Sequence, residues 1–134
     1  LKRLVKVHQE LDADATLLLQ KMEDPRQYGI VEVEKLVAGK NYRVNKALEK
    51  PEKPTSKLAI MPIYIFRSVI FEALEKTPLG KGGEIQLTDG IQMLIDWKRK
   101  VYAIILKTDE KRLDIGSPET YWNALRLSYQ HATR

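Results

Sequence analysis

The stretch LAIMPIYIFRSVIFEAL, residues 58–74, decides the fold class, because its hydrophobic pattern changes within a few residues. Residues 58–66 are nearly all apolar, which is typical of a strand covered on both faces. From Ser68, which can cap a helix, apolar residues recur at helical spacing as far as Leu74. A strand followed directly by a helix is the repeating unit of α/β folds.

The same alternation of strand and helix patterns runs through the rest of the chain. Buried or alternating runs predict strands at residues 15–19, 28–33, 42–48 and 101–106, and a further strand that ends in Leu113-Asp114-Ile115-Gly116. Helical spacing predicts an opening helix to Leu11, a helix with Thr88 or Asp89 as its N-cap, and a closing helix that starts at Pro118. We therefore expect one α/β domain over residues 1–134, with a mixed β-sheet flanked by helices.

Composition and charge indicate one globular domain and argue against a nucleic-acid-binding protein. The 134 residues are 43% hydrophobic and 31% charged, which is the balance of one globular domain. The net charge of +5 is spread along the chain with one dense cluster, Lys98-Arg99-Lys100. This pattern favours a solvated basic face that attracts small phosphorylated ligands, and we expect no nucleic-acid partner.

Cysteine usage and hydropathy indicate the compartment. The sequence has no cysteine, so it can form neither a disulfide framework nor a thiolate metal site. Its longest apolar stretches fall far short of the roughly 20 residues that span a bilayer. We expect a cytoplasmic protein that does not bind a membrane.

The chemistry is carried by four short strings rather than by a hydrolytic triad or a dinucleotide-binding glycine motif, neither of which is present. Each string places a charged or flexible residue at the end of a strand or in a loop, where α/β sheets bind ligands. Each also has a structural alternative: a bulge, a solvated charge pair, a hinge and a turn cap respectively. The strings are Tyr28-Gly29-Ile30-Val31, Leu48-Glu49-Lys50-Pro51, residues 82–89 (GGEIQLTD) and Leu113-Asp114-Ile115-Gly116.

In this order and at these separations the strings resemble the C-terminal half of the sugar-1-phosphate nucleotidylyltransferases. The resemblance covers almost the whole chain and is closest to the bacterial and archaeal UTP–glucose-1-phosphate uridylyltransferases. It implies the C-terminal part of a Rossmann-like nucleotidyltransferase fold. Glu-Lys-Pro and Gly-Glu-Ile-Gln-Leu-Thr-Asp are its most specific strings.

The resemblance implies a role for each matching residue. Gly29 lets the backbone approach the sugar, and Glu49 accepts hydrogen bonds from sugar hydroxyls. Lys50 meets the phosphate of the sugar as a point charge. Asp114 is one of two carboxylates that hold a catalytic magnesium ion.

The wall of the sugar pocket is implied less specifically. Residues matching Ile60 and Tyr64 line this pocket in the related thymidylyltransferases. Pro62, however, departs from the glycine that is common in the uridylyltransferase pattern.

The implied reaction is UTP plus glucose 1-phosphate giving UDP-glucose and pyrophosphate. The nucleotide-binding loop of the family, Gly-x-Gly-Thr-Arg, and the first magnesium aspartate both precede the matched segment, so we expect this chain alone to be inactive. Thymidylyl or guanylyl transfer, or a non-catalytic subunit of the same fold, are the alternatives. We also expect a homo-oligomer.

Overall fold

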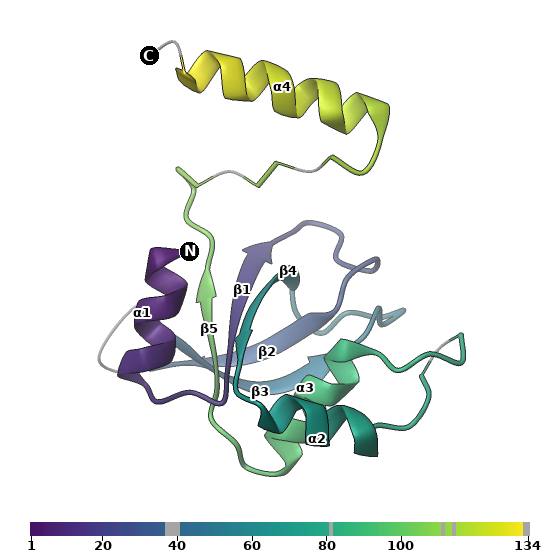
Figure 1. Ribbon diagram of the computed structural model, residues 1–134. Coiled ribbons are helices and arrows are strands. Elements are labelled where there is room, and N and C mark those ends of the chain that lie inside the picture. The colour runs from purple at the N-terminus through teal and green to yellow at the C-terminus, as the bar shows by residue number, and fades with distance from the viewer. Residues whose placement is uncertain (37–40, 81, 111, 114, 133–134) are drawn as a thin grey trace.

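Five strands form a mixed sheet that closes into a barrel in the computed structural model, which describes residues 1–36, 41–80, 82–110, 112–113 and 115–132 (Figure 1). The strand order is β1-β4-β2-β3-β5, and β5 returns to pair with β1. The β1/β5 pair is parallel and the other pairs are antiparallel. The strands are β1 (Ala15–Lys21), β2 (Ile30–Lys35), β3 (Tyr42–Leu48), β4 (Leu58–Phe66) and β5 (Val101–Ile105).

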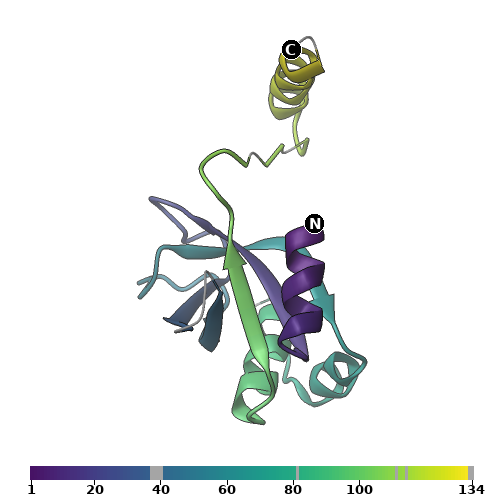
Figure 2. The same ribbon diagram turned by 90° about the vertical axis from the view of Figure 1, so that its left-hand side faces the viewer.

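In the described part of the chain, four helices accompany the barrel. They are α1 (Lys2–Glu10), α2 (Val69–Lys76), α3 (Leu87–Asp96) and α4 (Pro118–Ala132). Helices α2 and α3 lie together at one end of the barrel, while α1 lies along its outer face (Figures 1 and 2). The predicted α/β class with a mixed sheet and flanking helices is confirmed, whereas the closure of the sheet into a barrel was not predicted.

Alternation along β1 produces two cores on opposite sides of the sheet. Because successive strand residues point to opposite faces, Leu17 and Leu19 pack into the main core, which β1 shares with β3, β4, α2 and α3. Leu18 points outward and packs against Leu4 and Val7 of α1. Both faces of β1 are therefore covered along its middle, which explains the three consecutive leucines at residues 17–19.

Two helices pack closely because one contact position is a glycine. A Cβ atom added to Gly90 of α3 would lie 2.6 Å from Cδ2 of Leu74 on α2. The helix α3 is thus held against α2 on one side and against β3 and β5 on the other. This placement fixes the first turn of α3 next to the end of β3.

Several predicted details differ from the structure. The strand predicted to end at Leu113-Asp114-Ile115-Gly116 is wrong for its described part, because no strand forms over residues 106–110, 112–113 and 115–117. A strand needs a neighbouring strand to pair with, and no described strand runs beside this segment. Strand β4 is covered on both faces only in part, because Pro62 and Ile63 are exposed. The N-cap of α3 is Gln86, not Thr88 or Asp89.

Helix α4 stands apart from the barrel in both views (Figures 1 and 2). Within α4, all of whose residues the structure describes, Ala124 alone is buried. The Trp122 side chain is 67% exposed. Among the described residues, no helix is long and apolar enough to cross a membrane.

We expect Trp122→Ala to change the free energy of unfolding of this chain by less than about 0.5 kcal/mol, because the indole makes few packing contacts. As the matched control, Leu17→Ala should cost about 2–5 kcal/mol, since it empties a fully buried position in the main core. Denaturant unfolding followed by circular dichroism measures both. A loss of several kcal/mol for Trp122→Ala would show that α4 packs on the barrel in solution.

Candidate functional site

Glu49 and Lys50 follow β3 directly and lie at the end of the barrel nearest α3. The Lys50 backbone has φ of 39°, a left-handed conformation that is uncommon for a residue other than glycine. Such a conformation costs on the order of 1–3 kcal/mol and persists only where surrounding contacts hold it. Here the Lys50 N–H donates to the Tyr28 carbonyl oxygen at 3.2 Å. The turn therefore ties the end of β3 to the segment that precedes β2.

Gly29 lies between the end of β3 and strand β4. The Ile60 N–H donates to the Gly29 carbonyl oxygen at 2.8 Å, which fixes the glycine backbone. A Cβ atom on Gly29 would lie 2.6 Å from Thr88 Oγ1, 3.0 Å from Glu49 Oε2 and 3.3 Å from Ile60 Cδ1. Gly29 has no left-handed φ, so space rather than backbone conformation requires a glycine here.

In this arrangement, the reason why position 29 is a glycine differs from the predicted one. The resemblance implies that the missing side chain of Gly29 makes room for a sugar. In the structure the Thr88 hydroxyl and the Glu49 carboxylate occupy that direction. The glycine therefore makes room for a hydrogen bond within the protein.

Thr88 is the site residue that sequence reasoning missed. Its hydroxyl donates to Glu49 Oε2 at 2.5 Å, and the residue is only 7% exposed. The string GGEIQLTD contains Thr88, but helical pattern alone favours reading a threonine near a helix start as a cap. Its actual partner is 39 residues away in the sequence, which no local pattern reveals.

Lys50 carries the accessible positive charge of this cluster. Its side chain is 52% exposed and its Nζ lies 3.7 Å from Glu49 Oε1, a long and therefore weak ion pair. Arg26, which lines the same shallow groove as Lys50, is instead held by two hydrogen bonds to Asp24 at 2.7 and 2.8 Å. These bonds hold the pKa of Asp24 near 2. Of these two cations, Lys50 is thus the more available to an anionic ligand.

Glu49 is a partly buried charge that affects its neighbours. Burial raises the pKa of Tyr64, and the negative charge of Glu49 raises it further. The pKa of Asp89 is raised for the same two reasons, with burial the larger. Both shifts indicate that Tyr64 and Asp89 lie close enough to the Glu49 carboxylate for its negative charge to act on them.

The structure brings most of the predicted site residues together. Gly29, Glu49, Lys50 and Ile60 form one cluster, which we call the β3-end cluster together with Thr88. Tyr64, farther along β4, lies within electrostatic range of the same carboxylate, whose charge raises the pKa of its hydroxyl beyond the effect of burial. Ile60 is 6% exposed and belongs to the main core, so it forms the floor of the cluster. What these residues bind stays a prediction.

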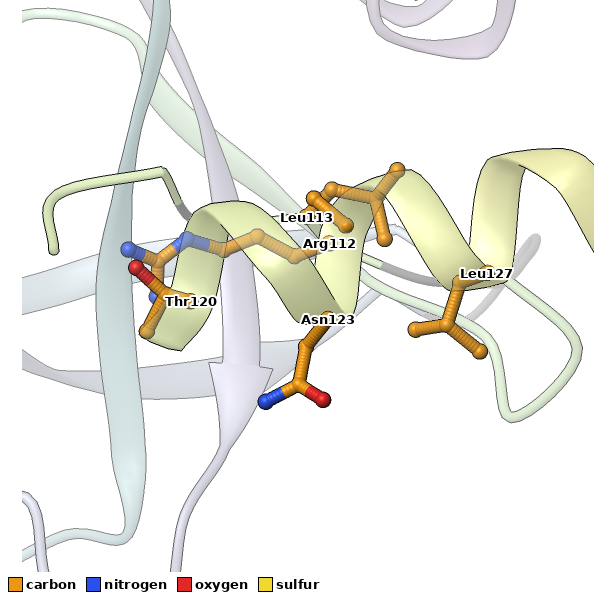
Figure 3. A pocket seen from close by; sticks show the side chains of 6 residues that line it. Arg112, Leu113, Thr120, Asn123 and Leu127 are labelled. Atoms are coloured by element: carbon orange, nitrogen blue, oxygen red, sulfur yellow. The ribbon is translucent and has the colours of Figure 1, made fainter. Parts of the chain in front are cut away.

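Asp114 lies outside the described residues. Near it in sequence, Arg112 and Leu113 line a small cavity against α4, together with Thr120, Asn123, Ala124 and Leu127 (Figure 3). None of the residues predicted to contact the sugar or its phosphate lines this cavity. We therefore place the candidate site at the β3-end cluster and not beside α4.

We expect Gly29→Ala to destabilise the chain by about 1–3 kcal/mol, because the new methyl group overlaps Thr88 Oγ1. The cost should shrink when the same change is made in a Thr88→Ala background, where the overlapping atom is gone. Denaturant unfolding of the two single variants and the double variant measures the coupling. Equal costs in both backgrounds would mean that the glycine is required for another reason.

Several known proteins are similar to this chain in sequence. The sequence profile of the nucleotidyl transferase family matches residues 1–130. The UTP–glucose-1-phosphate uridylyltransferase of Pseudomonas aeruginosa is 34% identical over 134 residues, which cover 98% of this chain and 47% of that protein. The enzyme of the same name from Bacillus subtilis is 43% identical over 96 residues, 70% of this chain and 32% of that protein.

A solved structure is similar over nearly the whole chain. A UDP-glucose pyrophosphorylase crystallised with UDP-glucose superposes with a TM-score of 0.83 at 29% identity, covering 97% of this chain and 49% of that one. The chain thus spans about half the length of these relatives at most. With a family profile that matches 130 of its 134 residues and a fold shared with a UDP-glucose pyrophosphorylase, the chain belongs to the nucleotidyl transferase family.

Proposed function

We propose that this chain forms the sugar-phosphate-binding side of a UTP–glucose-1-phosphate uridylyltransferase. The observation that carries the proposal is the pairing of a partly buried carboxylate, Glu49, with an exposed ammonium, Lys50, at the end of one strand. A sugar phosphate carries the complementary groups, hydroxyls and a dianion, joined in one small molecule. The names of the similar proteins support this reading.

Glu49 suits the sugar. Its side chain is 18% exposed, so a ligand can reach it, yet one oxygen already accepts the Thr88 hydroxyl. The second oxygen, Oε1, remains for hydroxyl donors of the sugar. Because an ionised carboxylate has acceptors only, it can bind two neighbouring hydroxyls but repels the phosphate, which fixes the orientation of the ligand.

Lys50 suits the phosphate. Its left-handed backbone and the following Pro51 turn the chain at this point, and the side chain is exposed to solvent. In the proposed reaction an oxygen of the sugar phosphate attacks the α-phosphorus of UTP, a new P–O bond forms, and the bond to the β-phosphate breaks. Pyrophosphate leaves with the bonding electron pair. The attacking oxygen is already ionised, so the step needs positioning and charge neutralisation rather than a general base.

We propose that the nucleotide is bound by residues outside this chain. The sequence has no Gly-x-Gly-Thr-Arg loop, and none of the residues in the β3-end cluster is suited to read a base. We infer that the chain corresponds to about half of the enzyme, that a separate part binds the nucleotide and completes the site, and that this chain alone does not turn over. Thymidylyl or guanylyl transfer on the same fold is the alternative. A cytoplasmic location and a homo-oligomer stay predictions.

A magnesium ion also stays a prediction. Among the described residues, no three side chains of His, Cys, Asp or Glu are placed to hold a metal ion. Asp114, the expected ligand, lies outside them. We propose that Asp114 and a carboxylate from the other half would hold the ion, which when bound would neutralise charge on the phosphates. The roles of Glu49 and Lys50 do not depend on it.

We expect Glu49→Gln to weaken binding of glucose 1-phosphate to this chain about ten- to a hundred-fold, because an amide loses the charge-assisted hydrogen bonds to the sugar. The control is Glu75→Gln, which removes an exposed carboxylate of α2 and should leave affinity unchanged. Isothermal titration calorimetry measures both.

Two results would contradict the proposal. The first is a wild-type chain that does not bind glucose 1-phosphate at millimolar concentration. The second is a Glu49→Gln variant that binds as tightly as the Glu75→Gln control.

A further inference from the structure

We propose that Thr88 is a positioning residue for Glu49, and that the conspicuous string GGEIQLTD exists to place its hydroxyl. The inference rests on the function proposed above and goes beyond it, since it assigns a role to a residue that does not itself contact the sugar. Thr88 would act by holding the carboxylate in one orientation.

The Thr88 hydroxyl is directed to Glu49. Thr88 lies in the first turn of α3 and is 7% exposed, so water has little access to it. Its hydroxyl donates to Glu49 Oε2 at 2.5 Å, the short distance expected for a hydroxyl bound to an ionised carboxylate. This is a contact between side chains of different elements, and it fixes one oxygen of a flexible glutamate.

A second hydrogen bond anchors α3 to β3 next to the first. The Ala47 N–H donates to Gln92 Oε1 at 2.7 Å, and Gln92 Nε2 in turn donates to Asp96 Oδ1 at 2.7 Å. Thr88 and Gln92 are one helical turn apart, roughly 6 Å, and Ala47 and Glu49 are two strand residues apart, roughly 6.7 Å. The two spacings match, so one face of α3 binds the end of β3 at two successive points.

The space around Glu49 is shaped for this contact. Gly29 has no side chain exactly where Thr88 Oγ1 and Glu49 Oε2 meet, since a Cβ there would be 2.6 and 3.0 Å from these atoms. With Oε2 held by Thr88, Oε1 is left on the side of Lys50, 3.7 Å from its Nζ. The Thr88 hydroxyl thus gives the two oxygens of Glu49 different roles. Oε2 accepts a hydrogen bond within the protein, and Oε1 is left to accept hydrogen bonds from the ligand.

The test uses this chain and two variants of Thr88, one without the hydroxyl and one that keeps it. Thr88→Val keeps the shape of the side chain and removes the hydroxyl, whereas Thr88→Ser keeps the hydroxyl. The matched control is Thr77→Val, because Thr77 is equally buried at 7% but its hydroxyl donates to the Ala73 carbonyl oxygen within α2. If Thr88→Val does not fold, Thr88→Ala replaces it, since alanine lacks the hydroxyl and favours the helix.

Two readouts separate positioning from stability. The first is the dissociation constant for glucose 1-phosphate, which we expect to rise about ten-fold in Thr88→Val, to stay within about two-fold in Thr88→Ser, and not to change in Thr77→Val. The second is the mobility of the Glu49 side chain without ligand, from ¹³C relaxation of its methylene groups. We expect Glu49 to be ordered in the wild type and in Thr88→Ser, and mobile in Thr88→Val.

The outcomes are distinct. Thr88→Val with an ordered Glu49 and unchanged affinity would overturn the positioning role. An equal loss of affinity in Thr77→Val would also overturn it, because the effect would then follow stability alone. If the wild-type chain binds no glucose 1-phosphate, the proposed function fails, while the mobility of Glu49 in Thr88→Val still decides whether Thr88 positions it.

Discussion

Strand β1 pairs along both of its edges, and this double pairing is the constraint on which the rest of the structure depends. It is antiparallel to β4 on one side and parallel to β5 on the other, so both of its backbone edges are satisfied. Its side chains are buried on both faces, against the main core and against α1. Because β4 and β5 are fixed by β1, β2 and β3 close the ring between them, and the end of β3 is brought beside α3.

The candidate site follows from that closure. Glu49 and Lys50 extend β3 past the last ladder pair, where the strand turns, and the residues before β2 and the start of α3 meet them there. The members of the β3-end cluster therefore come from four separate parts of the chain, residues 29, 49–50, 60 and 88, and are held in place by hydrogen bonds or by packing. A partly buried carboxylate beside an exposed lysine is costly to hold in a fold unless it is hydrogen-bonded, which the Thr88 hydroxyl achieves.

Much of the fold and part of the site could be predicted from the sequence, for identifiable reasons. Hydrophobic patterns gave strands β3 and β4 with their observed bounds, because these runs are local and end at clear turn residues. Glu49 and Lys50 stood out because they come between a strand and a proline. Thr88 did not, since its partner lies 39 residues away, and the closure of the barrel depends on still longer contacts. The strand expected to end at Leu113-Asp114-Ile115-Gly116 does not form in its described part, because a strand needs a neighbouring strand, which a single sequence does not reveal.

The most direct measurement is a pair of titrations of the ¹⁵N-labelled chain followed by ¹H–¹⁵N spectra, one with glucose 1-phosphate and one with UTP. If the chain is the sugar-phosphate side of a nucleotidyltransferase, glucose 1-phosphate should shift the amide signals of Gly29, Glu49, Lys50 and Thr88, and UTP at the same concentration should leave them nearly unchanged. Shifts confined to α4 and residues 112–113, or shifts at the β3-end cluster caused by UTP but not by glucose 1-phosphate, would contradict that assignment.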